Sequence, residues 1–120
     1  MATLNKVYLI GLVGRDPDVR DTEKGKVASF SLATTNSYKD KSGERHEETD
    51  WHTCVVWGPS AGYVEKYVTK GSSVLVEGRL HYRKYNDKNG DVKYVTEILA
   101  SSIESLSRKR KDDEEPDDLP

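Results

Sequence analysis

The chain has 120 residues, a formal net charge of −2 and a charged content of 33%. This length fits one domain with a modest core, and a hydrophobic content of 34% is low for an enzyme with a deep pocket. No apolar run approaches the roughly 18 residues of a membrane-spanning helix, and the N-terminus lacks the apolar stretch of a signal peptide. We therefore expect a cytoplasmic protein.

The charges are segregated along the chain. Residues 112–120 hold six of the 21 acidic residues and no base, and all 19 lysines and arginines precede them. Such a segment is usually disordered and solvated. We expect a folded domain over residues 1–107 and a flexible tail over 108–120 that is first basic and then acidic. The tail is either a solubility segment, or it binds other proteins or the basic surface of its own domain.

The first predicted strand covers residues 6–14 and is apolar on both faces, because side chains alternate along a strand. Its two apolar sets are Val7, Leu9 and Val13 on one face, and Tyr8, Ile10 and Leu12 on the other. A strand with two apolar faces is covered on both sides. In so short a chain we expect the second cover to be another subunit, with Tyr8 and Ile10 in the contact.

A second strand is predicted over residues 27–36, after a break at Pro17 and a turn over 23–26. Its apolar residues alternate with small or polar ones, so it is expected to be half-buried. The polar stretch 37–48 then leads to the next strand. The two strands should form a long hairpin with a charged and mobile tip.

The third strand, over residues 51–57, carries both tryptophans. One face holds Trp51, Thr53, Val55 and Trp57, and the other holds His52, Cys54 and Val56. The tryptophan face is either part of the core or a platform on which flat ligands stack.

Cys54 is the sole cysteine, which excludes an internal disulfide and any multi-cysteine zinc site. We interpret it as a small buried residue rather than a nucleophile. His52 and Cys54 cannot complete a tetrahedral metal site between them. We therefore expect neither metal nor cofactor.

A helix is predicted over residues 60–70, with Ser60 as its N-cap and Gly71 just beyond its C-terminus. A strand over 73–85, a turn over 86–90 and a strand over 92–100 follow, and Ile103 and Leu106 could extend the last strand.

Three strands, a helix and a two-stranded hairpin form the element order of the OB-fold, which binds oligonucleotides or oligosaccharides. We predict an all-β protein: a five-stranded OB-fold barrel with one helix between its third and fourth strands.

Several short motifs, in the same order along the chain, resemble the bacterial single-stranded DNA-binding protein family. They are Asn5-Lys6-Val7, Gly11-Leu12-Val13-Gly14-Arg15-Asp16-Pro17, Phe30-Ser31-Leu32-Ala33-Thr34, Thr49-Asp50-Trp51-His52, Lys70-Gly71-Ser72 and Val76-Glu77-Gly78. The resemblance implies a homo-oligomer, usually a tetramer, that binds and protects single-stranded DNA without sequence preference in replication, recombination and repair. It implies no enzymatic activity and a cytoplasmic, nucleoid-associated location.

The resemblance also implies roles for individual residues. Bases would stack on Tyr38, Trp51, Trp57 and Tyr85, each contact contributing about 1–3 kcal/mol. Phosphates would be contacted by Lys6, Lys39, Lys41, Arg45, Arg83, Lys84 and Lys93. His52 would lie near a subunit contact. Tyr82 and Tyr94 either stack on bases or pair across the last hairpin.

Asp117, Asp118, Leu119 and Pro120 resemble the family's acidic tip, which usually ends in Phe after a long linker. In the family this tip binds replication and repair proteins.

Other functions fit parts of the sequence. An OB-fold accessory protein that prefers RNA or acts in a priming complex would share the fold. A hydrolase using His52 and Cys54 is disfavoured, because no carboxylate pair, glycine-rich phosphate loop or Ser/His/Asp pattern accompanies them. An adaptor protein would not bind oligonucleotides through its aromatic side chains.

Overall fold

The computed structural model describes residues 1–107. The elements are β1 (Val7–Val13), β2 (Asp18–Thr22), β3 (Gly25–Lys39), β4 (Arg45–Trp57), α1 (Pro59–Tyr67), β5 (Ser73–Asn86) and β6 (Val92–Ser105). The predicted tail, including Asp117, Asp118, Leu119 and Pro120, lies outside the described residues.

Five of the strands close into a barrel. Neighbouring strands follow the order β1-β5-β6-β4-β3-β2, and β1 pairs again with β3 to complete the ring. The junction between β4 and β6 is parallel and short, joining Cys54–Val56 to Ile98–Ala100. The helix α1 lies between β4 and β5 in the chain, so the predicted five-stranded OB-fold barrel with its single helix is confirmed.

The apolar core fills the barrel and the space against α1. It includes Phe30 and Leu32 of β3, Cys54 and Val56 of β4, and Val64 of α1. The helix packs against β3, β4 and β6. Within the barrel, buried residues alternate with less buried ones over Ala28–Leu32 of β3 and Cys54–Trp57 of β4, because the barrel wall has one inner and one outer face.

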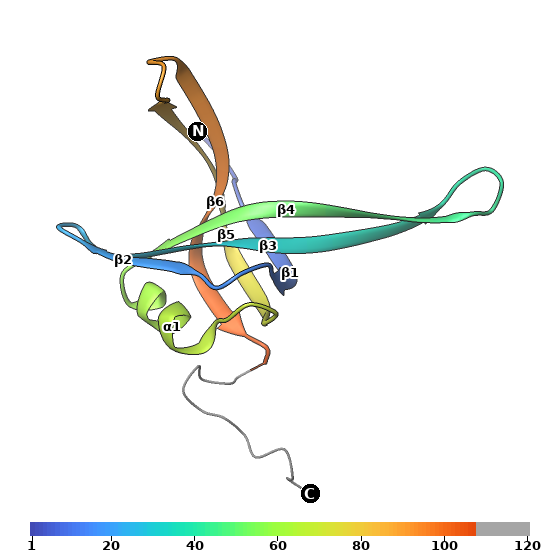
Figure 1. Cartoon of the computed structure of the whole chain (residues 1–120), viewed down its shortest axis with the longest axis horizontal. Helices are drawn as coiled ribbons and strands as arrows, with labels where there is room; N and C mark the ends of the chain where they lie inside the picture. Colours follow the sequence, from blue (N-terminus) through green and yellow to red (C-terminus); the bar gives the residue numbers. More distant parts are fainter. Residues whose placement is uncertain (108–120) are drawn as a thin grey trace, which may run out of the picture.

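Two hairpins extend well beyond the barrel. Figure 1 shows the β3–β4 hairpin running out to the right and the β5–β6 hairpin rising at the top. We call them the β3–β4 arm and the β5–β6 arm. Pairing along the first continues from Val27↔Trp57 to Lys39↔Arg45, and along the second as far as Asn86↔Val92.

The predicted polar connection over 37–48 was therefore too long, although the predicted long hairpin is confirmed. Only residues 40–44 form the tip, since β3 ends at Lys39 and β4 begins at Arg45. Exposed polar residues continue the strands here because cross-strand pairing does not require a buried face.

The strand β2 was not predicted. Its sequence Asp-Val-Arg-Asp-Thr is polar, and only Val19 packs against the core. It is held by its antiparallel pairing with Gly25–Ser29 of β3, and the Thr22 hydroxyl donates to the Gly25 carbonyl at 2.7 Å. This strand is therefore stabilised by backbone pairing with β3, and its sequence has no alternating hydrophobic pattern from which it could be predicted.

The predicted helix ends were wrong. Gly58 is the N-cap, with a φ of 79° that favours glycine, and Pro59 opens the helix. Ser60 therefore lies inside the first turn. The helix ends at Tyr67, and Gly71 lies in the turn beyond it, where its N–H donates to the Val13 carbonyl at 2.8 Å. Among residues 1–107 no helix has the length and apolar character to cross a membrane.

Candidate nucleic-acid interface

Trp51 and Trp57 lie on the outer face of β4, with 61% and 44% of their surfaces exposed. The intervening inner-face residues Cys54 and Val56 are buried. The predicted alternation is confirmed, and the interpretation of the tryptophans as core residues is wrong. Burial raises the pKa of the Cys54 thiol to about 12, which agrees with an unreactive structural cysteine.

The Trp51 indole lies against Gly14, where the chain leaves β1. A Cβ atom on Gly14 would lie 2.5 Å from Cζ3 of Trp51, so only glycine leaves room for the ring. The backbone at Gly14 is fixed in turn, because its N–H donates to the Ser31 carbonyl at 3.0 Å.

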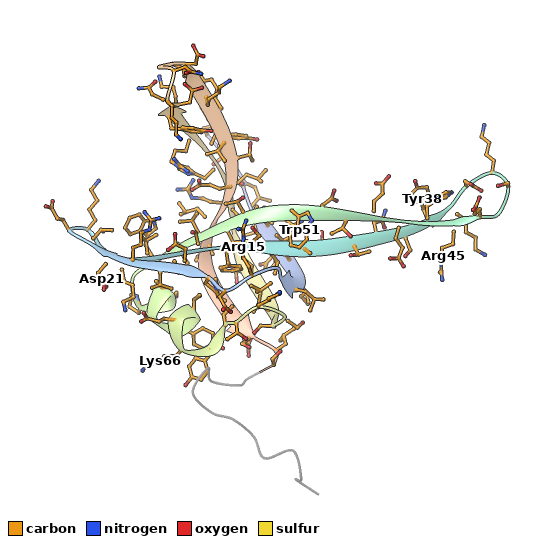
Figure 2. The ribbon with its side chains drawn as sticks, in the orientation of Figure 1. Arg15, Asp21, Tyr38, Arg45, Trp51 and Lys66 are labelled. Carbon is orange, nitrogen blue, oxygen red and sulfur yellow. The ribbon has the colours of Figure 1, made fainter. Side chains whose placement is uncertain are left out.

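Arg15 is a cation near this ring that the sequence analysis did not single out. Gly14, Arg15, Ser31 and Trp51 line a hollow of about 260 Å³, and Figure 2 shows Arg15 and Trp51 at the centre of the molecule. A guanidinium beside an exposed indole can hold a phosphate while its base stacks on the ring. Arg15 could have been found from its position directly after Gly14, in the second of the family-like motifs.

A second hollow, of about 230 Å³, also has Trp51 in its lining. The other residues are His52, Thr53, Leu80, Thr96, Glu97 and Ile98. They come from β4, β5 and β6, so this hollow lies where the two arms separate. Trp51 therefore lines both hollows, one on the side of β1 and one on the side of the β5–β6 arm.

His52 is half-buried on β4, and its Nε2 is hydrogen-bonded to the Thr34 hydroxyl at 2.9 Å. It points away from the tryptophan face, as the alternation predicts. Its predicted role at a subunit contact stays a prediction.

Tyr38 lies on the β3–β4 arm, directly opposite His46. The two rings are stacked, with centroids 5.4 Å apart, and the tyrosine is 43% exposed. One face of Tyr38 is therefore occupied within the chain. A base can stack only on the other face.

Asp40 organises the tip of this arm. One carboxylate oxygen accepts from the backbone N–H of Ser42 and of Glu44, both at 2.9 Å, and the other accepts from Nε2 of His46 at 2.8 Å. The Ser42 hydroxyl, His46 and the Glu44 backbone together lower the pKa of Asp40 to about 2.

Asp40, Glu44 and His46 also have potential metal-ligating atoms within 4.8 Å of one another, a grouping that the sequence analysis did not consider. Asp40 already accepts hydrogen bonds from its neighbours, and Glu44 is exposed at the tip. Nothing further points to a metal here.

Tyr85 is 45% exposed on the β5–β6 arm, and the Arg83 guanidinium lies 5.9 Å from its ring centroid. Arg83 is also tied to an acid, because its Nε donates to Glu97 at 3.1 Å. Glu97 is only 3% exposed. This pairing, which the sequence analysis missed, reduces the charge that Arg83 can offer to a phosphate.

The other predicted cations fall into two groups. Lys6 forms an ion pair with Glu77 beside Tyr8, and the hydrogen bond to that carboxylate raises its pKa. Within the described part of the chain, the remaining five take no part in an ion pair; they are Lys39, Lys41, Arg45, Lys84 and Lys93. These five lie on the two arms, near Tyr38 and Tyr85.

The site residues are thus not gathered into one pocket. They follow an extended course along the β3–β4 arm, across the barrel wall at Trp51, and along the β5–β6 arm (Figure 2). Such a surface fits a long, flexible and negatively charged ligand with flat groups.

Comparisons with known proteins agree with this geometry. The model of the single-strand binding protein family matches residues 4–106. A single-stranded DNA-binding protein of Rickettsia felis is 48% identical over 106 residues, covering 86% of this chain and 70% of that protein. Single-stranded DNA-binding protein 1 of Chlorobaculum tepidum is 46% identical over 108 residues, covering 88% of this chain and 67% of that protein.

A solved structure, Plasmodium falciparum SSB in complex with single-stranded DNA, is also similar. It has a TM-score of 0.80 and 39% identity, and the match covers 88% of this chain and 97% of that one.

Proposed function

The chain belongs to the single-strand binding protein family, whose members bind single-stranded DNA and are not enzymes, and on this premise we propose how it binds. It protects single-stranded DNA during replication, recombination and repair. Bases stack on Tyr38, Trp51, Trp57 and Tyr85, and lysines and arginines hold the phosphates.

The observation that carries this proposal is the exposure of Trp51 and Trp57 on one face of one strand. Two large aromatic rings left in water on the outside of a barrel forgo the free energy of burial, which favours a ligand that covers them. Because every base has a π-face, stacking on these rings is tolerant of sequence.

The cations of the two arms supply the electrostatic part. Lys39, Lys41, Arg45, Lys84 and Lys93 contact phosphates, and Arg15 joins them beside Trp51. Lys6 and Arg83 remain in the site, but their carboxylate partners Glu77 and Glu97 reduce their contribution.

We also propose that the protein is a homo-oligomer, with a tetramer as the expected form. Tyr8, Ile10 and Leu12 form an apolar row on the outer side of β1, and they are 64%, 61% and 56% exposed. A contiguous apolar row on a barrel wall fits the same row of a second copy. We propose that His52 also lies near this contact between subunits. Sedimentation velocity tests this proposal. The Ile10→Asp variant should form smaller assemblies than the wild-type protein.

The acidic tail is proposed to recruit replication and repair proteins through Asp117, Asp118, Leu119 and Pro120. A nucleoid-associated, cytoplasmic location follows from this function.

Competition binding tests the proposed function. A fluorescent oligothymidine bound to the protein should be displaced by unlabelled single-stranded DNA of any sequence, and not by duplex DNA at the same nucleotide concentration. Displacement by RNA at lower concentration than by DNA would instead favour the RNA-preferring alternative. Failure of every oligonucleotide to bind would contradict the proposal.

A further inference from the structure

The β5–β6 arm has two faces, and the predicted DNA-binding aromatic Tyr85 lies on only one of them. Opposed residues of an antiparallel pair share a face. The pairs Leu80↔Ile98, Tyr82↔Thr96 and Lys84↔Tyr94 therefore lie together, opposite the face of Tyr85 and Lys93. We call the exposed residues Leu80, Tyr82, Lys84, Tyr94 and Thr96 the tyrosine face.

Tyr82 and Tyr94 are 67% and 73% exposed, the largest values for aromatic side chains within residues 1–107. They are diagonal neighbours across the two strands, as the pairs Tyr82↔Thr96 and Lys84↔Tyr94 require. Neither takes part in the ring pairs of the described residues, which join Tyr38 to His46 and Tyr63 to Tyr67. Both rings therefore have surface available for a flat ligand.

The positive charge of the tyrosine face favours a negatively charged partner. Lys84 lies directly opposite Tyr94, and in the described part of the chain it forms no ion pair. No position of the tyrosine face is a carboxylate. The nearest acid in the chain beyond Lys84 is Asp87, in the turn, where its carboxylate accepts from the N–H groups of Asn89 and Asp91.

This composition differs from that of the apolar row on β1. That row is mainly aliphatic, with Ile10 and Leu12 beside Tyr8, and Glu77 lies opposite Tyr8 on β5. An aliphatic row suits another copy of the chain, whereas exposed aromatic rings beside a free cation suit bases and phosphates.

The tyrosine face is continuous with the site at Trp51. Leu80 and Thr96 line the hollow of about 230 Å³ that also contains Trp51. Two residues further along β5 stands Tyr82, about 7 Å beyond Leu80, and Lys84 follows after a similar step. A strand that leaves Trp51 through this hollow meets Tyr82 and then the Lys84–Tyr94 pair.

We propose that the tyrosine face is a second stacking track, which takes further bases of the single strand that leaves Trp51. This inference rests on the proposed function and deepens it, because both faces of the β5–β6 arm then bind DNA. Removal of the rings should shorten the length of DNA that each subunit contacts, while the contacts at Trp51 remain.

The double variant Tyr82→Ser with Tyr94→Ser tests this with two oligothymidines, of about 4 and about 16 nucleotides, the range of site sizes for one OB-fold. The dissociation constant for the longer one should rise about 5- to 150-fold per stacked base lost, and the constant for the shorter one should stay unchanged. The matched control, Tyr82→Phe with Tyr94→Phe, keeps the rings and should bind both oligonucleotides as the wild type does.

The outcomes separate this inference from the proposed function. If the wild type binds neither oligonucleotide, the proposed function itself fails, and this inference fails with it. If the wild type binds both and the serine variant is unchanged on the longer one, the second track is overturned. A lower assembly state of the serine variant without DNA would also overturn it, since the face would then be a contact between copies.

Ultraviolet cross-linking of the wild-type protein gives a test that does not depend on the variant's folding. Peptide mass spectrometry should find thymidine attached to Tyr82 or Tyr94 with the longer oligonucleotide. Cross-links confined to other residues would contradict the second track.

Discussion

Gly14 and Trp51 form a fixed pair in which the indole occupies the space of the missing side chain. A Cβ atom on Gly14 would lie 2.5 Å from Cζ3 and 2.9 Å from Cη2 of the ring. The position of the exposed ring is therefore restricted by Gly14, the residue that directly follows β1. Stacking depends on that position, so Gly14 is a positioning residue for the proposed interface.

Gly14→Ala should weaken binding of oligothymidine by about 1–3 kcal/mol, the contribution of one stacked base, because the methyl group displaces the Trp51 ring. Gly62→Ala, in α1, is the matched control, since a Cβ there meets no atom within 4 Å. Fluorescence anisotropy titrations compare the two variants. Equal affinities would show that the close contact does not position the ring.

Glu97→Gln should strengthen DNA binding by releasing Arg83. The substitution removes a buried negative charge whose partner Nε lies at 3.1 Å, and Arg83 then becomes available to a phosphate. The plot of log affinity against log salt should become steeper by about 0.7, the value for one additional phosphate contact. The free energy of unfolding should fall by about 1–3 kcal/mol. An unchanged salt dependence would contradict the role assigned to Glu97.

The Asp40 carboxyl group at the tip of the β3–β4 arm should stay ionised until the pH falls to about 2, because its pKa is lowered from 3.8 to about 2. A carboxyl group with a lowered pKa in the folded state contributes stability that is present above pH 4 and is lost as the pH falls through about 2. NMR titration of the Asp40 carboxyl carbon measures this. A midpoint near 3.8 would mean that the hydrogen bonds to Ser42, Glu44 and His46 do not persist in solution.

Cys54 should not react with thiol reagents in the folded protein at pH 8, since the thiolate is the reactive form and burial raises the pKa of the thiol to about 12. Addition of denaturant should make it react fully. Alkylation followed by mass spectrometry gives both rates. Rapid labelling of the native protein would show that the β4–β6 junction opens readily.

Much of the barrel could be predicted from the sequence because the core strands alternate clearly. The alternation over 51–57 placed Cys54 inside and the two tryptophans on a common face, and both placements are confirmed. The order of the strands and the helix along the chain was sufficient to predict the OB-fold.

Features that depend on partners distant in the sequence could not be predicted. The strand β2 has no hydrophobic pattern and exists because β3 pairs with it. The pairing of Arg83 with Glu97 and the stacking of Tyr38 on His46 require the registers of two hairpins, which alternation does not give. Arg15 becomes part of the site only because Trp51 lies over the neighbouring Gly14.

The most direct test of the central claim is quenching of tryptophan fluorescence during titration with oligothymidine. The proposed interface predicts strong, saturable quenching, since Trp51 and Trp57 stack on bases, with affinity decreasing as salt increases. Duplex DNA should not reverse it. Binding detected by anisotropy without any quenching would place the DNA elsewhere on the molecule and contradict the proposed interface.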